Sequence, residues 1–342
     1  MRNKVTMQEI ADLVGVSKFA VSRALSSKPG VSPQTRETIL KAAGQLGYFN
    51  HNELAKTTIE MRPVQQSGLS GTIVILFPNV RYQNKESLYW GPVFDGITNR
   101  LNQEKLDIVT LTEPSTDKMF SLLNPEAIHG IITIGSISTP ILLDIGRLNI
   151  PVIMVDHADP AFQCDTVFAD NFNGMRKIMT RLISRGYRKY QFVGNIRDAQ
   201  SFYERWIAFK AALEEHDIGL KQDPLLAGPD ADDIYTLMPK VSLDELPEVF
   251  VCANDSNAAF LVDELHKRGI RVPEQCVVTG FDNTDDSHPI LATVNVNKEL
   301  LGVRAVDQLL WRIVNRESAF ERKLISGELI VREQYAARST AD

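Results

Sequence analysis

Residues 5–48 read VTMQEIADLVGVSKFAVSRALSSKPGVSPQTRETILKAAGQLGY. Thr6, with a glutamate three positions later, has the spacing of a capping box at the start of a helix. Gly15 is expected to end that helix, because glycine adopts the left-handed cap without steric cost. Ser17 is a typical N-cap for a second helix. Two short helices around a tight turn predict a helix-turn-helix, a motif that places its second helix in the major groove of DNA.

The expected second helix runs from Lys18 to about Ser26 and leaves mostly short polar or basic side chains outside. Its outer face carries Lys18, Phe19, Ser22, Arg23 and Ser26. Such side chains can meet base edges and phosphates. A third helix is expected to begin at Ser32-Pro33. Three small helices also occur in domains that bind no nucleic acid, but caps, turn and apolar periodicity agree over the whole stretch, which favours a DNA-binding head.

The charge of the chain is distributed as DNA binding requires. The 342 residues carry a formal net charge of −6, which alone argues against a polyanionic partner. Residues 1–66, however, carry nine Lys/Arg and five Asp/Glu. The N-terminal part therefore carries a net positive charge, which suits contacts with the phosphates of DNA.

Composition limits the class of protein further. A hydrophobic content of 44% over 342 residues supports a full core and two or three domains. The three cysteines, Cys164, Cys252 and Cys276, have no C-x-x-C spacing and are expected to be free thiols. We find no N-terminal apolar segment typical of export and no long apolar run, so a cytoplasmic protein without a membrane span is expected.

Beyond a polar linker at residues 65–71, short β-rich runs alternate with helix-length stretches. The runs are Ile73-Phe77, Ile108-Leu111, Gly130-Ile134, Val152-Val155, Gln191-Gly194, Val249-Ala253 and Val277-Phe281. This spacing is typical of βα units in parallel sheets, and the length of the region predicts two α/β lobes. In such folds ligands bind beyond the carboxyl ends of the strands.

Polar side chains follow several of these runs, where a ligand site is expected. They are Asp156, Asn195, Asn254-Asp255 and Asp282-Asn283, with Arg205 on the helix after the Gln191-Gly194 run. Carboxylates, amides and an arginine that converge from several strand ends suit a ligand with many hydroxyl groups. Each residue alone is also an ordinary cap of a loop or helix, so residue type leaves both roles open.

The head resembles that of lactose-repressor-type (LacI/GalR) regulators. The shared elements are V-T, A-x-x-x-G-V-S, V-S-R, V-S-x-x-T-R and L-G-Y. The resemblance implies that Lys18 and Phe19 occupy the main base-reading positions on double-stranded operator DNA. It implies contacts to the DNA backbone or to base edges for Thr6, Ser17, Ser22, Arg23 and Ser26.

The chain departs from this family after Tyr48. The usual proline-asparagine and hinge helix are replaced by FNHNELAKTTI at residues 49–59. In the family a pair of leucines wedges into the minor groove and kinks the DNA. Leu54 or Ile59 is the expected wedge here. Threonines are poor helix formers, so the hinge is expected to fold only on DNA.

The body resembles the sugar-binding core of the same regulators, which they share with periplasmic sugar-binding proteins. The matching runs include NIPVIMVDH, ERWIAFKAALEE, NDSNAAF and VVTGFDN. The resemblance implies that Arg205 binds the effector with a bidentate contact. It implies that Asp282 and Asn254 form hydrogen bonds with the effector's hydroxyl groups and that Asp156 lies nearby. Tyr89-Trp90 fall where the family carries aromatic residues, and either stacking on a sugar ring or core packing would suit them.

These features predict an all-α helix-turn-helix head joined to a two-lobed α/β core with parallel sheets, like that of periplasmic binding proteins. The expected domains are the head at residues 1–50, a hinge and linker at 51–70, and an effector-binding and dimerisation domain at 71–342. The expected function is a ligand-responsive transcription regulator, a repressor of carbohydrate-metabolism genes. It would bind a palindromic operator as a homodimer and respond to a sugar or sugar derivative.

The alternative from another class is a sugar- or nucleotide-processing α/β enzyme with an appended helical domain. The sequence lacks a Walker loop, G-x-S-x-G, H-E-x-x-H and a paired-cysteine zinc site. We therefore expect no catalytic residue, no cofactor and no metal ligand. Unchanged sugar or nucleotide after incubation with the protein would favour the regulator.

Overall fold

The computed structural model describes residues 5–46, 48, 71–78, 84–112, 125–228, 233–243 and 245–336. The chain divides into two compact units, which we call unit 1 and unit 2. Unit 1 comprises Met1–Val167 and Leu301–Lys323, and unit 2 comprises Phe168–Leu300 and Leu324–Asp342. The chain therefore passes from one unit to the other three times, after Val167, Leu300 and Lys323.

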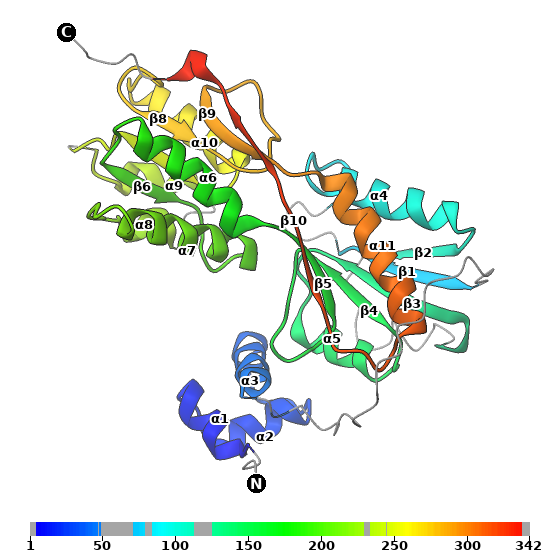
Figure 1. Cartoon of the computed structure of the whole chain (residues 1–342). Coiled ribbons are helices and arrows are strands. Elements are labelled where there is room, and N and C mark those ends of the chain that lie inside the picture. Colours follow the sequence, from blue (N-terminus) through cyan, green and yellow to red (C-terminus); the bar gives the residue numbers. More distant parts are fainter. Residues whose placement is uncertain are drawn as a thin grey trace. The chain divides into compact units, whose positions relative to one another are not determined.

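The N-terminal part of unit 1 is all α-helical (Figure 1). Its helices are α1 Met7–Val14, α2 Lys18–Leu25 and α3 Pro33–Gln45. Thr6 and Glu9 form the predicted capping box, and Gly15 adopts the left-handed conformation with φ 72°. Ser17 caps α2 by accepting a hydrogen bond from the Ala20 amide. The predicted helix-turn-helix is therefore confirmed down to its caps.

A small apolar core holds the three helices together. Ile10, Val21, Ala24 and Ile39 are buried in one cluster that draws on all of them. Leu13 of α1 lies outside this core and is 57% exposed. The packing of this core therefore determines which faces of α1 and α2 point outward.

The α/β part of unit 1 is built on a six-stranded sheet with the order β10-β5-β4-β3-β1-β2. Its strands are β1 Thr72–Leu76, β2 Asp107–Leu111, β3 Ile128–Ile134, β4 Val152–Val155, β5 Asp165–Ala169 and β10 Arg322–Ile325. β1 pairs in parallel with β2 and β3, and β4 pairs in parallel with β3 and β5. The strands β1, β3, β4 and β5 are buried along almost their whole length, as strands covered on both faces must be.

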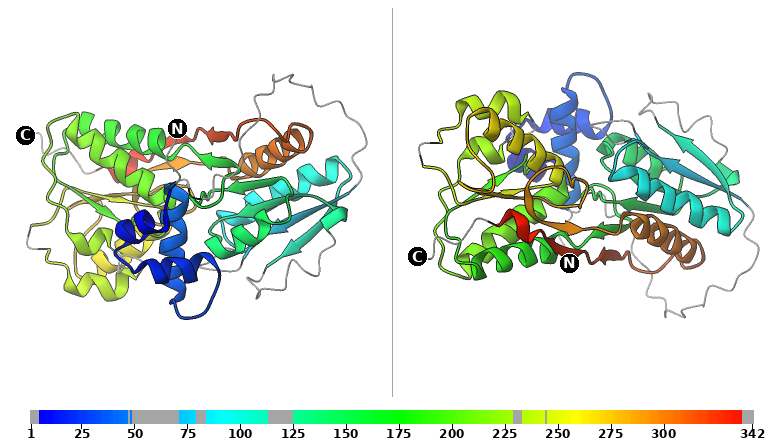
Figure 2. Two further views of the ribbon diagram at one scale, coloured as in Figure 1. Left: turned by 90° about the horizontal axis from the view of Figure 1, so that it is seen from below. Right: turned by 90° about the horizontal axis from the view of Figure 1, so that it is seen from above.

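Helices cover both faces of this sheet. Helix α5 (Thr139–Gly146) buries Leu142 and Ile145 against the strands. Helices α4 (Trp90–Gln103) and α11 (Lys298–Val314) lie beside each other (Figures 1 and 2, α4 in cyan, α11 in orange). They approach so closely that a Cβ on Gly302 would lie 2.2 Å from the Val93 carbonyl oxygen. A short 3-10 helix at Pro125–Ala127 precedes β3.

Unit 2 has a five-stranded sheet with the order β11-β9-β8-β7-β6. Its strands are β6 Tyr190–Val193, β7 Val249–Cys252, β8 Val277–Thr279, β9 Ile290–Asn295 and β11 Glu328–Val331. Only β11 pairs antiparallel, with β9. The helices are α6 Asn171–Ser184, α7 Gln200–Glu214, α8 Pro224–Ala227, α9 Ile234–Leu237 and α10 Asp255–Lys267, with 3-10 helices at Met238–Lys240 and Glu333–Tyr335.

The helices of unit 2 also lie on two faces. Helices α8, α9 and α10 contribute Leu226, Leu237 and Leu261 to a core cluster with Phe250 of β7. Helix α6 packs on strands β9 and β11, and α6 and α7 pack on each other. The carboxyl ends of β6, β7, β8 and β9 therefore lie at one edge, with α6, α7 and α10 beginning near it.

Every run predicted as a strand forms one, and the predicted fold class is confirmed. Four further strands were not predicted from the sequence: β5, β9, β10 and β11. In β5, Asp165 is fully buried because Arg312 of α11 binds it with two hydrogen bonds of 2.7 Å. A charge inside a run argues against a buried strand unless a partner neutralises it, and this partner lies far along the chain.

Candidate functional site

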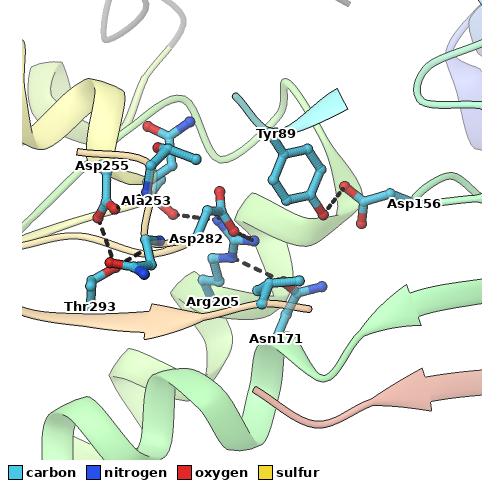
Figure 3. A network of polar contacts seen from close by, with 12 residues as sticks. Tyr89, Asp156, Asn171, Arg205, Ala253, Asp255, Asp282 and Thr293 are labelled. Atoms are coloured by element: carbon cyan, nitrogen blue, oxygen red, sulfur yellow. Dashed lines mark hydrogen bonds and ion pairs between the residues drawn. The ribbon is translucent and has the colours of Figure 1, made fainter. Parts of the chain in front are cut away.

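The most buried charged cluster of unit 2 is centred on Arg205 of α7. The side chain is 1% exposed. Its Nε donates to Asn171 Oδ1 at 3.0 Å, and its Nη1 donates to the Ala253 carbonyl at 2.7 Å. Nη1 and Nη2 also donate to the two carboxylate oxygens of Asp282, at 3.3 and 2.9 Å (Figure 3). The guanidinium is therefore engaged by α6, by the end of β7 and by the loop after β8.

An aromatic ring supports the guanidinium from one face. The Cζ atom of Arg205 lies 3.8 Å from the centroid of Phe281, a cation–π contact. Gly174 of α6 makes room for that ring, since a Cβ at this position would lie 2.6 Å from Phe281 Cζ. Helix α6 thus fixes Arg205 twice, directly through Asn171 and indirectly through the ring.

Asp282 has a backbone conformation that few residues other than glycine adopt. Its φ is 92°, and Asn283 follows with φ 51°. The ammonium of Lys298 donates to the carbonyl oxygen of Asp282 and, at 3.3 Å, to that of Val296. Burial lowers the pKa of Lys298. A buried lysine therefore fixes the peptide that carries the carboxylate.

The start of α10 contributes a second buried carboxylate beside the first. Asp255 is 0% exposed and accepts hydrogen bonds from the Thr293 hydroxyl at 2.8 Å and the Thr284 amide at 2.7 Å. Burial raises the pKa of Asp255 to about 6. Asn254 is the N-cap of α10, and its Oδ1 accepts from the Asn257 amide at 2.9 Å. Its amide nitrogen is not used by that cap.

Unit 1 brings together two more of the predicted site residues. The Tyr89 hydroxyl donates to Asp156 Oδ2 at 3.4 Å (Figure 3). Tyr89 and Trp90 stand edge to face at the start of α4, with ring centroids 4.8 Å apart, and both are half-buried. That exposure is compatible with stacking on a ligand and with core packing. Asp156 has φ 53° directly after β4.

Three residues of the Arg205 cluster were not predicted from sequence: Asn171, Phe281 and Lys298. Asn171 and Lys298 follow β5 and β9, the strands that the periodicity missed. Had those strands been recognised, the rule that ligand-site residues follow strand ends would have found both. Asn195, which was predicted, accepts from the Arg197 amide at 3.0 Å and has no hydrogen bond to Arg205 in the described part of the chain.

Several head residues that were predicted to contact DNA form hydrogen bonds within the protein. Thr6 and Ser17 are the caps of α1 and α2. The Ser26 hydroxyl donates to the Ser22 carbonyl at 2.7 Å. Lys18 and Phe19 are exposed on the first turn of α2, where a helix that enters a groove meets base edges first. Leu54 and Ile59, the expected wedge, lie outside the described residues.

Arg23 and Arg36 fix the loop that follows α2. Arg23 Nε donates to the Pro29 carbonyl at 2.5 Å, and its guanidinium lies 5.2 Å from the Phe19 ring centroid. Arg36 of α3 donates to the carbonyls of Arg23, Ala24 and Lys28. Arg36 therefore binds the last carbonyls of α2, a role that the sequence did not reveal.

Over the described residues, no group of three or more His, Cys, Asp or Glu side chains could hold a metal ion. None of the helices that the structure describes is both long and apolar enough to span a bilayer.

Comparison with protein families assigns both parts of the chain. The family described as "Bacterial regulatory proteins, lacI family" matches residues 6–50, and the "Periplasmic binding protein-like domain" matches residues 179–333. Residues 6–50 therefore form a lacI-family helix-turn-helix domain, and residues 179–333 form part of a periplasmic-binding-protein-like domain. The chain is a DNA-binding transcription regulator, and its fold is the predicted one, a helix-turn-helix head with a two-lobed α/β core.

Relatives cover nearly the whole length of this chain. The probable HTH-type transcriptional repressor ExuR of Bacillus subtilis (strain 168) is 25% identical over 98% of this chain and 100% of its own. The HTH-type transcriptional repressor PurR of Haemophilus influenzae (strain PittEE) is 25% identical over 96% and 98%. These relatives are repressors.

Solved structures confirm the fold. The transcriptional regulator CelR, solved as a cellobiose complex, is 21% identical with a TM-score of 0.67, covering 96% of this chain and 99% of its own. The Lac repressor dimer bound to operator and the anti-inducer ONPF is 20% identical with a TM-score of 0.63, covering 98% and 100%.

Proposed function

We propose that this regulator is a lacI-type repressor whose occupancy of a palindromic operator is set by a small polyhydroxylated effector. One observation carries the proposal. The same chain presents an exposed helix-turn-helix surface and holds a buried arginine–aspartate pair at the strand ends of a binding-protein-like unit. The first feature suits DNA and the second suits a ligand with hydroxyl groups.

The proposed DNA interface is the outer face of α2 with the adjacent caps. Lys18 and Phe19 would read bases, and Thr6, Ser17, Ser22, Arg23 and Ser26 would contact backbone or base edges. Two copies of the chain would present two such heads to the two halves of a palindrome, because a two-fold dimer repeats one surface. The Lac repressor structure supports this, since it is a dimer bound to operator.

The division of the chain follows from this role. We propose that residues 1–50 form the head, residues 51–70 the hinge and linker, and residues 71–342 the effector-binding and dimerisation domain. Leu54 or Ile59 would supply the minor-groove wedge in the hinge. A repressor of this kind acts on DNA, so we propose that it works in the cytoplasm.

The proposed effector contacts start from the Arg205–Asp282 pair. Each carboxylate oxygen of Asp282 keeps a lone pair for another donor, and the Arg205 hydrogen bonds described above use four of the five N–H groups. The pair therefore offers acceptors and a donor side by side, which a hydroxyl group can satisfy. Asn254 would add its amide nitrogen.

In unit 1, Tyr89, Trp90 and Asp156 are proposed as further effector contacts. An aromatic face suits the apolar face of a sugar ring, and Asp156 suits a hydroxyl. Two similar structures hold sugars, cellobiose in CelR and ribose in a regulator from Enterococcus faecium. A sugar or sugar derivative, and regulation of carbohydrate metabolism, are the corresponding proposals for this chain.

We propose that the chain carries out no catalysis. In unit 2, Arg205 is paired with Asp282, while Asp255 and Lys298 are held by hydroxyl, amide and carbonyl groups, an arrangement that suits binding more than proton transfer. Purified protein should leave sugars and nucleotides chemically unchanged after prolonged incubation. Turnover of any of them would contradict this part of the proposal.

The experiment that tests the function uses the purified full chain. Duplexes are selected from a random DNA library, and sugars, uronates and purines are screened for thermal stabilisation, since a ligand that binds the folded state raises its melting temperature. The proposal expects a palindromic consensus and at least one stabilising ligand that changes affinity for it. Selection of no sequence, or ligands without effect on DNA binding, would contradict it.

A further inference from the structure

Phe19 is the most exposed large apolar side chain of the described head. It is 68% exposed, against 57% for Leu13 and 37% for Leu46. It lies on the first turn of α2, next to Lys18 and away from the Ile10 and Val21 core. This surface otherwise carries short polar and basic groups. A large ring on it is therefore expected to contact apolar surface on a binding partner.

The ring is held in place by its neighbours on the same helix. Arg23 follows Phe19 by one turn, and its guanidinium lies 5.2 Å from the ring centroid. Arg23 is itself fixed, because its Nε donates to the Pro29 carbonyl at 2.5 Å. Gly30, with φ 104°, lies so close that a Cβ would come within 3.0 Å of Arg23 Nε. An ordered ring loses less conformational entropy on binding than a free one.

The chemistry of the major groove leaves one partner for such a ring. Base edges there present hydrogen-bond donors and acceptors, with which phenylalanine forms no hydrogen bond. The one apolar group is the C5 methyl of thymine. We propose that Phe19 selects thymine at one base pair in each operator half-site, through contact between its ring and the C5 methyl. The proposal rests on the proposed function, in which α2 enters the major groove.

With this contact, Lys18 and Phe19 of α2 recognise different chemical groups of the bases. Lys18, a donor, suits the O6 and N7 acceptors of guanine, whereas Phe19 recognises a methyl group. The methyl contact does not depend on hydrogen bonding, so replacing the methyl by hydrogen isolates it. Deoxyuridine differs from thymidine by that methyl alone and pairs with adenine in the same way.

The test begins with the duplex that the wild-type full chain selects from a random library. Each thymine is replaced in turn by deoxyuridine, symmetrically in both half-sites, and affinity is measured by fluorescence anisotropy. Removing one buried methyl should weaken binding roughly fourfold per half-site, the factor that corresponds to about 0.8 kcal/mol. The proposal expects one symmetric thymine pair at which both half-sites lose this factor.

Variants assign the loss to the ring. Phe19→Ala should bind the thymine and deoxyuridine duplexes equally, and Phe19→Leu should keep part of the difference. Leu13→Ala, which also removes an exposed apolar side chain from the head, should keep all of it. Thermal melts confirm that these surface changes leave the head folded. A deoxyuridine effect of the same size in Phe19→Ala, or no effect at any thymine, overturns the inference while leaving the operator-binding function standing. Failure of the wild type to select any sequence overturns both.

Discussion

Arg205 and Asp282 form a buried two-point ion pair, with Nη2 to Oδ1 at 2.9 Å and side chains that are 1% and 8% exposed. Seventy-seven positions separate them along the chain. Removing the charge from one partner leaves the other buried and uncompensated.

Asp282→Asn should destabilise unit 2 and weaken a hydroxyl-bearing effector. The volume is kept, but one acceptor oxygen becomes an amide donor that faces the guanidinium. Loss of one partner of a buried pair costs roughly 3–5 kcal/mol. Urea unfolding measures the first effect and calorimetry with the effector the second. The control is Glu215→Gln, which breaks the exposed pair with Arg176 and should change the free energy of unfolding little, because water screens an exposed pair. Equal effects of the two variants would show that burial does not matter here.

Asn171→Ala should lower the free energy of unfolding by about 1–3 kcal/mol, because Arg205 Nε loses its acceptor in a buried site. Asn171 is 1% exposed, so water does not replace the side-chain oxygen easily. Thr180→Ala, an exposed change on the same helix, is the matched control. If both variants unfold like the wild type, Asn171 does not position Arg205.

Gly174→Ala should act on the same arginine from a distance. The new Cβ would lie 2.6 Å from Phe281 Cζ, so the ring that supports Arg205 must shift. Overpacking of this kind costs roughly 1–3 kcal/mol, and effector affinity should fall with it. Gly219→Ala, where nothing lies within 4 Å of the new Cβ, should change neither quantity. Full effector affinity in Gly174→Ala would contradict the proposed chain of contacts.

Asp255 should make unit 2 less stable as pH rises through the interval from about 4 to about 6. Burial raises its folded-state pKa to about 6 from 3.8, so the folded state holds a proton that the unfolded state has lost. The free-energy cost of burying the ionised carboxylate is absent below the pKa of the unfolded state. It is complete above the pKa of the folded state, at about 3 kcal/mol. Chemical unfolding of the wild type and Asp255→Asn over this interval gives the difference between their stabilities. That difference should shift by about 3 kcal/mol in favour of the variant. A difference that does not change with pH would contradict the buried-carboxylate account.

Much of this architecture could be predicted from sequence because local signals matched the final environment. The capping box at Thr6 and the glycine at residue 15 act within one turn, so neighbouring residues decide them. Six of the seven predicted runs are largely buried, the exception being Ile108–Leu111 of the edge strand β2, and none of the seven carries a charged residue that would obscure it.

The remainder depends on partners distant in sequence. Asp165 breaks the apolar pattern of β5 and is tolerated only because Arg312 reaches it. With β5 unrecognised, Asn171 could not be placed at a strand end, and the same holds for Lys298 after β9. Arg205 and Asp282 were each predicted as ligand contacts, but their mutual pairing is a property of the folded unit.

The measurement that tests the central claim most directly is operator affinity with and without effector in Arg205 variants. Arg205→Ala leaves Asp282 unpaired, so Arg205→Gln with Asp282→Asn, a neutral hydrogen-bonding pair, is measured beside it. The account predicts that effector changes wild-type operator affinity on the order of 5-fold to 150-fold. It predicts that both variants bind operator as the wild type does but no longer respond to effector. An unchanged effector response in both variants would contradict the account.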